Sequence, residues 1–171
     1  MKHLLAVILL VPLVGCATLS EDQCRNADWE TIGKRDGSNG RLPDWIEKHA
    51  RACNQYGIAP VRATWEKGRQ QGLPLYCTPS RAWEEGADGK RLSPVCPADN
   101  LSELRRLNQR GLVYHRIGRD IEEAAREIDR INATISDLPA SDSARASLAS
   151  ERASLRLEIL TLRAERSLYR Y

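Results

Sequence analysis

The sequence predicts a mainly α-helical protein in which a small disulfide-stapled helical domain precedes a long antiparallel helical hairpin of coiled-coil type. Three observations predict this fold. The region up to Pro97 contains all four Trp, nine of the eleven Gly and all five cysteines, which are widely spaced. The region after Pro97 contains no Trp, Lys or Cys, and its apolar residues recur at alternating steps of three and four. Pro139 interrupts that second pattern and predicts the turn of a hairpin.

The N-terminal segment has the composition of an export signal. Lys2 is followed by an apolar run over residues 4–11 and then by Pro12. Such a run, about 7–15 residues long, is typical of a signal peptide and is too short to span a membrane. The segment ends in Leu-Val-Gly-Cys, with Gly15 and Cys16 at the expected cleavage point. We interpret this as a lipoprotein processing site at which Cys16 receives a diacylglycerol. A plain signal peptide with an incidental cysteine is the alternative.

This interpretation sets the expected organisation of the chain. We expect a lipoprotein signal peptide over 1–15, a lipidated linker over 16–23, a Cys/Gly/Trp-rich helical domain over 24–97 and a helical hairpin over 98–171. Two or more acyl chains hold a protein stably on a bilayer, so the membrane is the first expected partner. Ala17 follows the acylated cysteine, which favours the outer membrane and a domain that faces the periplasm.

Four cysteines remain after lipidation: Cys24, Cys53, Cys77 and Cys96. An even number of cysteines in an exported chain predicts disulfides, and four allow three connectivities. We favour the pairs Cys24–Cys53 and Cys77–Cys96 because each closes a loop of modest length. A zinc site is the alternative, since His49 and Cys53 lie four residues apart on one helix face. The sequence has no C-x-x-C pair and export favours oxidation, so we predict neither a metal nor a cofactor.

Before Pro97 we expect short helices near 27–37, 43–56, 61–71 and 79–86. Three stretches repeat an aromatic residue followed by two glycines at helix-like spacing: Trp29-Gly33-Gly37, Trp65-Gly68-Gly72 and Trp83-Gly86-Gly89. Glycine inside a helix costs about 1 kcal/mol relative to Ala, and it is tolerated where backbones approach closely or a helix ends. Phosphate-binding loops are the alternative, but no glycine here follows a strand or precedes a Lys-Ser/Thr pair.

After Pro97 we expect a first helix over about 100–137 and a second after the turn at Pro139. The first carries a heptad seam formed by Tyr114, Ile117, Ile121, Ala124, Ile128, Ile131, Ile135 and Leu138. The second carries Leu148, Leu155, Ile159, Leu162 and Tyr169. Leu157, Leu160 and Leu168 lie off this second seam and widen its apolar face. Their cover is either the protein's own core or a partner surface.

The four remaining cysteines alternate with spaced glycines and aromatic residues, with Asp36 before Gly37, with His49 four residues before Cys53, and with Leu73, Tyr76 and Pro97 near the last two cysteines. This pattern resembles a proteobacterial family of lipoproteins of unknown function, the domain of unknown function 2799. The resemblance covers roughly residues 20–118. Trp65 and Trp83 stand where the family often has Tyr. The family implies a lipoprotein with a helical domain and brings no activity, cofactor or catalytic residue. Besides the cysteines, the matching positions are Trp29, Gly33, Asp36, Gly37, His49, Gly68, Gly72, Leu73, Tyr76, Gly86, Gly89 and Pro97.

No catalytic residue is predicted. Only His49 and His115 remain once the signal is removed, and neither lies in a recognisable nucleophile motif. The adjacent acids Glu84 and Glu85 would point in different directions from a helix and could not flank one bond. A net charge of +3 over 171 residues is too small to indicate a nucleic-acid partner.

We therefore expect a non-enzymatic cell-envelope lipoprotein with a structural or protein-interaction role. Its partner would be another envelope protein or a second copy bound through the helical hairpin. The alternatives are a periplasmic hydrolase that modifies the cell wall with His49, and a metal-binding module.

Overall fold

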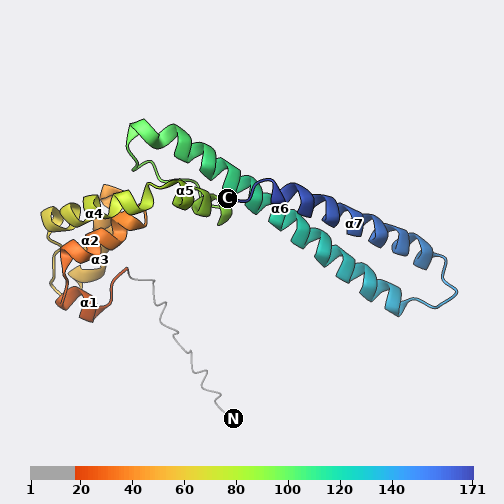
Figure 1. The fold of residues 1–171 in the computed structure, drawn as a ribbon. Helices are drawn as coiled ribbons and strands as arrows, with labels where there is room; N and C mark the ends of the chain where they lie inside the picture. The colour runs from red at the N-terminus through yellow and green to blue at the C-terminus, as the bar shows by residue number, and fades with distance from the viewer. Residues whose placement is uncertain (1–17) are drawn as a thin grey trace, which may run out of the picture.

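The computed structural model describes residues 18–171, which form helices and no strand (Figure 1). The predicted signal peptide over 1–15, the cleavage site at Gly15 and the lipidation site at Cys16 lie outside the described residues. The mainly helical fold class is confirmed. No helix among the described residues is both long and apolar enough to cross a membrane.

Four α-helices and a short 3-10 turn form a first helical unit. They are α1 (Glu21–Arg25), α2 (Trp29–Ser38), η1 (Pro43–Trp45), α3 (Ile46–Asn54) and α4 (Arg62–Tyr76). The Ser20 hydroxyl caps α1 and the Asp28 carboxylate caps α2 by accepting hydrogen bonds from backbone N–H groups of the first turn. The core of this unit contains Leu19, Cys24, Trp29, Ile32, Ile46, Cys53 and Trp65.

Helix α4 continues beyond residue 71, where its predicted end lay, and it includes Pro74 in its last turn. The sequence pattern favours an end at Gly72 because glycine and proline interrupt helices. Gly72 instead lies against the backbone of α2, and Tyr76 is 1% exposed. Tertiary packing therefore extends this helix past two residues of low helical propensity.

Glycines allow α2 and α4 to pack with their backbones in contact. A Cβ atom on Gly33 would overlap the carbonyl oxygen of Trp65, and one on Gly68 would overlap that of Glu30. Gly37 and Gly72 form the equivalent pair of contacts one turn further along. The glycine pattern that we interpreted as a device for close approach has that role in this helix pair.

Helix α5 (Pro79–Ala87) packs along the first part of α6 (Ala98–Asp137), again through glycine. Gly86 of α5 and Gly111 of α6 lie against each other's helix backbone. Composition divides the chain near Pro97, whereas packing divides it at the junction of α4 and α5, near Tyr76 and Cys77. Helix α5 has the composition of the first region but lies on the hairpin, because its glycine face matches that of α6.

Helices α6 and α7 (Ala144–Ser167) form the predicted antiparallel hairpin, which projects from the rest of the molecule (Figure 1). All eight predicted seam residues of the first helix are buried or half-buried, as are the five of the second. The chain turns at Pro139, and the carbonyls of Ile135 and Leu138 at the end of α6 accept hydrogen bonds from Arg145. The forty residues of α6 extend over about 60 Å.

Both favoured disulfides are present. Cys24 pairs with Cys53 and Cys77 pairs with Cys96, each with a Cα–Cα distance of 5.5 Å. The first joins α1 to α3, and the second closes the segment that carries α5. Because Cys53 is bonded to Cys24, its sulfur is not available as a zinc ligand. Among residues 18–171 no group of three or more His, Cys, Asp and Glu side chains is placed to hold a metal.

The segment expected to be a linker over 16–23 is folded from residue 18 onward. Leu19 is 2% exposed in the core, and Ser20 and Gln23 form a capping box at the start of α1. Residues 17–23 contain no apolar run, so this stretch predicts a linker. A single leucine and a well-formed helix cap are sufficient to anchor this short segment.

Replacement of Gly33 by alanine should lower the free energy of unfolding by at least about 1–3 kcal/mol, because the new Cβ forces α2 away from α4. Urea unfolding followed by circular dichroism, with the disulfides intact, measures this change. Lys34→Ala on the exposed side of the same helix is the control and should stay within about 0.5 kcal/mol of the parent. Equal stabilities of the two variants would contradict close packing at Gly33.

Candidate functional site

A buried polar cluster lies at the centre of the first helical unit. His49 of α3 is 1% exposed, and its Nε2 atom is 2.7 Å from Asp36 Oδ2 of α2. The same carboxylate oxygen accepts a hydrogen bond of 2.8 Å from Trp65 Nε1 of α4. The second ring nitrogen of His49, Nδ1, lies 2.9 Å from the hydroxyl oxygen of Thr18. Four separate segments therefore meet at one set of hydrogen bonds.

The order Thr18, His49, Asp36 matches the connectivity of a nucleophile, a base and an acid. A general base must reach the proton of a substrate, and the His49 ring is almost completely enclosed. Asp36 also accepts from Trp65, so its carboxylate holds α4 as well as the histidine. These contacts support a structural role in which buried polar groups satisfy one another.

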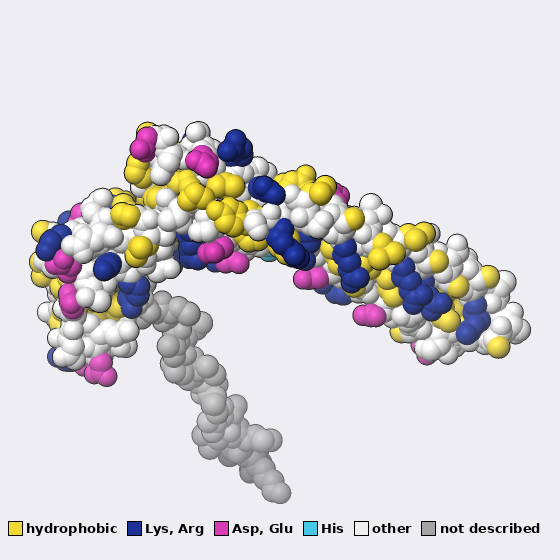
Figure 2. Space-filling model, viewed as in Figure 1, with side chains coloured by type: hydrophobic (Ala, Val, Ile, Leu, Met, Phe, Trp, Pro, Cys, Tyr) yellow, Lys and Arg dark blue, Asp and Glu magenta, His cyan; other side chains and the backbone are white. Residues whose placement is uncertain are grey.

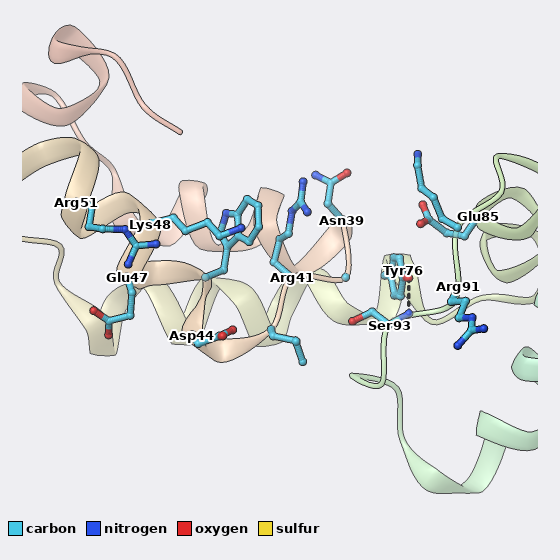
Figure 3. Close-up of a pocket in the computed structure, with 14 residues that line it drawn as sticks. Asn39, Arg41, Asp44, Glu47, Lys48, Arg51, Tyr76, Glu85, Arg91 and Ser93 are labelled. Atoms are coloured by element: carbon cyan, nitrogen blue, oxygen red, sulfur yellow. Dashed lines mark hydrogen bonds between the residues drawn. The ribbon is translucent and has the colours of Figure 1, made fainter. Parts of the chain in front are cut away.

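A shallow groove of about 580 Å³ lies between the first helical unit and the segment that follows α5 (Figure 3). One side is formed by the end of α2, η1 and α3, and the other by Tyr76, Glu85, Lys90, Arg91 and Ser93. Five of its lining side chains are basic: Arg41, Lys48, Arg51, Lys90 and Arg91. Two of its three acids pair with cations that do not line the groove, Glu47 with Arg62 and Glu85 with Arg81.

Trp45 organises the cations on the α3 side of the groove. The Arg41 guanidinium lies 3.8 Å and the Lys48 ammonium 3.7 Å from the centre of the indole ring. Cation–π contacts of this kind hold positive charge in place without an acidic partner. The groove therefore presents ordered basic groups suited to a carboxylate or a phosphate.

Tyr76 joins the two sides of the groove. Its hydroxyl oxygen accepts a hydrogen bond of 2.9 Å from the backbone N–H of Ser93, and burial raises the pKa of this hydroxyl. Its ring lies against Gly40, where φ is +65° and a Cβ atom would overlap the ring. Gly40 thus meets two requirements at once, a left-handed backbone and close contact with an aromatic ring.

Sequence reasoning missed Asn108, which organises the second helical unit, formed by α5, α6 and α7. Asn108 is 5% exposed, and its amide nitrogen donates to the carbonyls of Ala82 and Lys90. Its amide oxygen accepts from the backbone N–H of Leu92. One side chain of α6 thereby fixes α5 and the segment after it. The sequence signals this role of Asn108 in one way only: a polar residue stands where the helix period requires an apolar one.

The structure places the family-motif residues in three regions, besides Tyr76 in the basic groove and Gly86 at the contact of α5 with α6. Trp29, Gly33, Asp36, Gly37, His49, Gly68 and Gly72 lie within the first helical unit, in or beside its core. Gly89, with φ of +78°, ends the turn after α5, where His115 Nδ1 donates to the carbonyl of Ala87. Leu73 and Pro97 lie near the Cys77–Cys96 disulfide, and all four line a second hollow. Most motif residues therefore support packing and do not line the basic groove.

The comparison with family models gives one match. Residues 28–112 match the family described as a protein of unknown function, DUF2799. The chain belongs to this family. The match covers α2 to α5 and the first part of α6, so it includes both glycine contacts and both sides of the groove. No curated protein matches the chain, and no solved structure does.

The Asp36→Ala variant should unfold about 2–5 kcal/mol more readily than the parent, because His49 Nε2 and Trp65 Nε1 both lose their acceptor in a buried site. Urea unfolding followed by tryptophan fluorescence measures the loss. Asp44→Ala is the matched control, since Asp44 is exposed at η1. If the two variants were equally stable, the polar cluster would not contribute to the fold.

Proposed function

We propose that this DUF2799 protein is a non-enzymatic lipoprotein of the cell envelope. Its N-terminal acyl anchor would hold the first helical unit at a membrane, and its helical hairpin would bind a protein partner, either another envelope protein or a second copy of the chain. The observation that carries the proposal is the residue at which the described fold begins, close to the predicted lipidation site. Thr18, only two residues after Cys16, is hydrogen-bonded to the buried His49.

Because only two positions separate Cys16 from Thr18, the proposed anchor would hold the folded domain close to the membrane. Two residues extend over at most about 7 Å, so an acylated Cys16 would lie close to α1 and α3. Leu19 is buried, which prevents this segment from swinging away from the domain. The first helical unit would then rest on the membrane surface, with its first described residue only two positions from the acylated cysteine. The hairpin projects from the other end of the molecule (Figure 1).

Three features support an extracytoplasmic location for the domain. The segment over 1–16 has the pattern of a lipoprotein signal. Cys24, Cys53, Cys77 and Cys96 are all used in disulfides, which persist in oxidising compartments. The periplasm is such a compartment, and Ala17 favours the outer membrane as the site of attachment.

The interaction role rests on the hairpin. Leu157 and Leu160 on α7 and Leu168 at its C-terminal cap remain 60–72% exposed, so the protein's own core does not cover them. Exposed apolar side chains that gather on one surface mark sites of protein interaction. Basic side chains also recur along the hairpin between apolar ones (Figure 2).

Acylation of Cys16 is directly testable. In the native host, the full chain should carry labelled palmitate and fractionate with the outer membrane. Cys16→Ser should lose the label, while Ala17→Ser, one residue away, should keep it. An unlabelled, uncleaved product in the cytosol with all five thiols free would contradict the proposal.

The rival hydrolase makes a different prediction for the purified chain. The enclosed His49 leads us to expect no release of soluble fragments from peptidoglycan. Thr18→Val removes the hydroxyl that lies 2.9 Å from His49 Nδ1 and nearly preserves side-chain shape. Fragment release by the parent chain that disappears in Thr18→Val would favour the hydrolase over the proposed role.

A further inference from the structure

Helix α7 carries two apolar stripes on nearly opposite sides. The inner stripe contains Leu155, Ile159 and Leu162 and packs on α6. The outer stripe faces solvent, and every one of its members is exposed. Its residues within the helix are Ala146, Ser150, Ala153, Leu157, Leu160 and Ala164, and Leu168 follows at the C-terminal cap.

The outer stripe has the spacing of a coiled-coil seam. From Ala146 to Ala164 its members are separated by steps of four, three, four, three and four residues. At 3.6 residues per turn such positions form one continuous line along a helix. Leu157 and Leu160, at its centre, are 66% and 60% exposed. Helix α7 therefore has a second packing surface that the hairpin itself does not use.

Charges are sorted on the two flanks of this stripe. Arg156 and Arg163 lie on one flank, and Glu151, Glu158 and Glu165 lie beyond the small polar residues of the other. Each row repeats every seven residues, and an Arg and a Glu are never three or four positions apart. The two rows therefore cannot pair within the helix.

The charge rows of α7 contrast with those of α6. In α6, Glu122 pairs with Arg126 and Glu127 pairs with Arg130. Within residues 18–171 no ion pair forms at any of the five charged residues in the α7 rows. Their charges remain available to a partner molecule.

The acidic flank continues onto α6. A groove of about 370 Å³ between the two helices is lined by Asp120, Glu123, Glu127 and Glu158, with Arg130 as its one basic side chain. A partner that fits the outer stripe should therefore offer basic groups on this flank and acidic groups on the other. The Arg row of α7 itself has the required charge and the required seven-residue repeat.

We propose that the partner is a second copy of this chain, with α7 packed against α7 in parallel alignment. In a parallel two-fold pair, each helix turns its Arg flank towards the Glu flank of its partner. In an antiparallel two-fold pair the Arg rows would face each other and repel. Charge thus selects the parallel arrangement, and the outer leucines form its core.

Parallel alignment also suits two copies held in one membrane by their N-terminal segments. To that extent the inference rests on the proposed function, although the α7 contact does not itself need an anchor.

Beyond the helix end, the ring of Tyr171 lies 6.1 Å from that of Trp83 on α5. The Trp83 indole also donates to the carbonyl of Tyr169, which fixes the end of α7 in each copy.

Cysteine crosslinking of the full chain in its membrane tests both contact and alignment. Ala153→Cys, Leu160→Cys and Ala164→Cys should each form a disulfide-linked dimer, because a parallel pair places each residue opposite its counterpart. Glu158→Cys, exposed on the same helix but off the stripe, is the control and should remain monomeric on a non-reducing gel. Crosslinking at only one of the three positions would indicate an antiparallel pair and overturn the alignment.

Disruption of the stripe supplies the complementary measurement. The double variant Leu157→Glu/Leu160→Glu should raise the concentration needed for dimer formation at least about tenfold, since two buried leucines per copy are lost. Light scattering of the purified full chain measures this, and Glu158→Gln is the matched control. Both leucines are exposed in one copy, so the thermal midpoint of the monomer should not fall. A strictly monomeric parent chain, or crosslinks only to a different protein, would overturn the proposal.

The same two measurements on Cys16→Ser separate this inference from the proposed function. A dimer that persists without acylation supports the α7 contact alone. If Cys16→Ser loses the palmitate label but neither it nor the parent chain dimerises, the α7 contact is overturned and the acyl anchor is still supported.

Discussion

The close approach of paired helices at glycine is the constraint on which the rest of this structure depends. Gly33 and Gly68 bring α2 and α4 into backbone contact, and Gly86 and Gly111 do the same for α5 and α6. A domain of this size buries little apolar surface, so it needs tight contacts or covalent links. Here it has both, because a disulfide closes each unit.

The glycine contacts also set the positions of the buried polar residues in the first helical unit. Once α2 and α4 touch, Asp36 and Trp65 face each other, and α3 brings His49 between them. The result looks like part of an active site, yet its groups are enclosed and mutually satisfied. The side chains that a partner could reach lie elsewhere. They are the basic groups of the groove around Trp45 and the exposed leucines on the outer face of α7.

Much of the architecture was predictable from the residues alone. Helix content, the disulfide pairing and the hairpin seam all follow from local spacing, because helix periodicity and loop length act over a few tens of residues. The assignment of α5 was not predictable, since composition groups it with the first region while its Gly86 face packs on α6. Asn108 and the groove cations also escaped prediction, because their partners come from segments far apart in the chain.

By itself, then, the sequence determined a helical, disulfide-linked chain with a predicted lipid anchor and a coiled-coil hairpin. Only the tertiary structure decided that residues 18–23 are packed, that His49 is enclosed, and that α7 has an uncovered second seam. The physical reason is the same in each case. Periodicity tells which residues share a face of a helix, but burial depends on which other element comes to lie against that face.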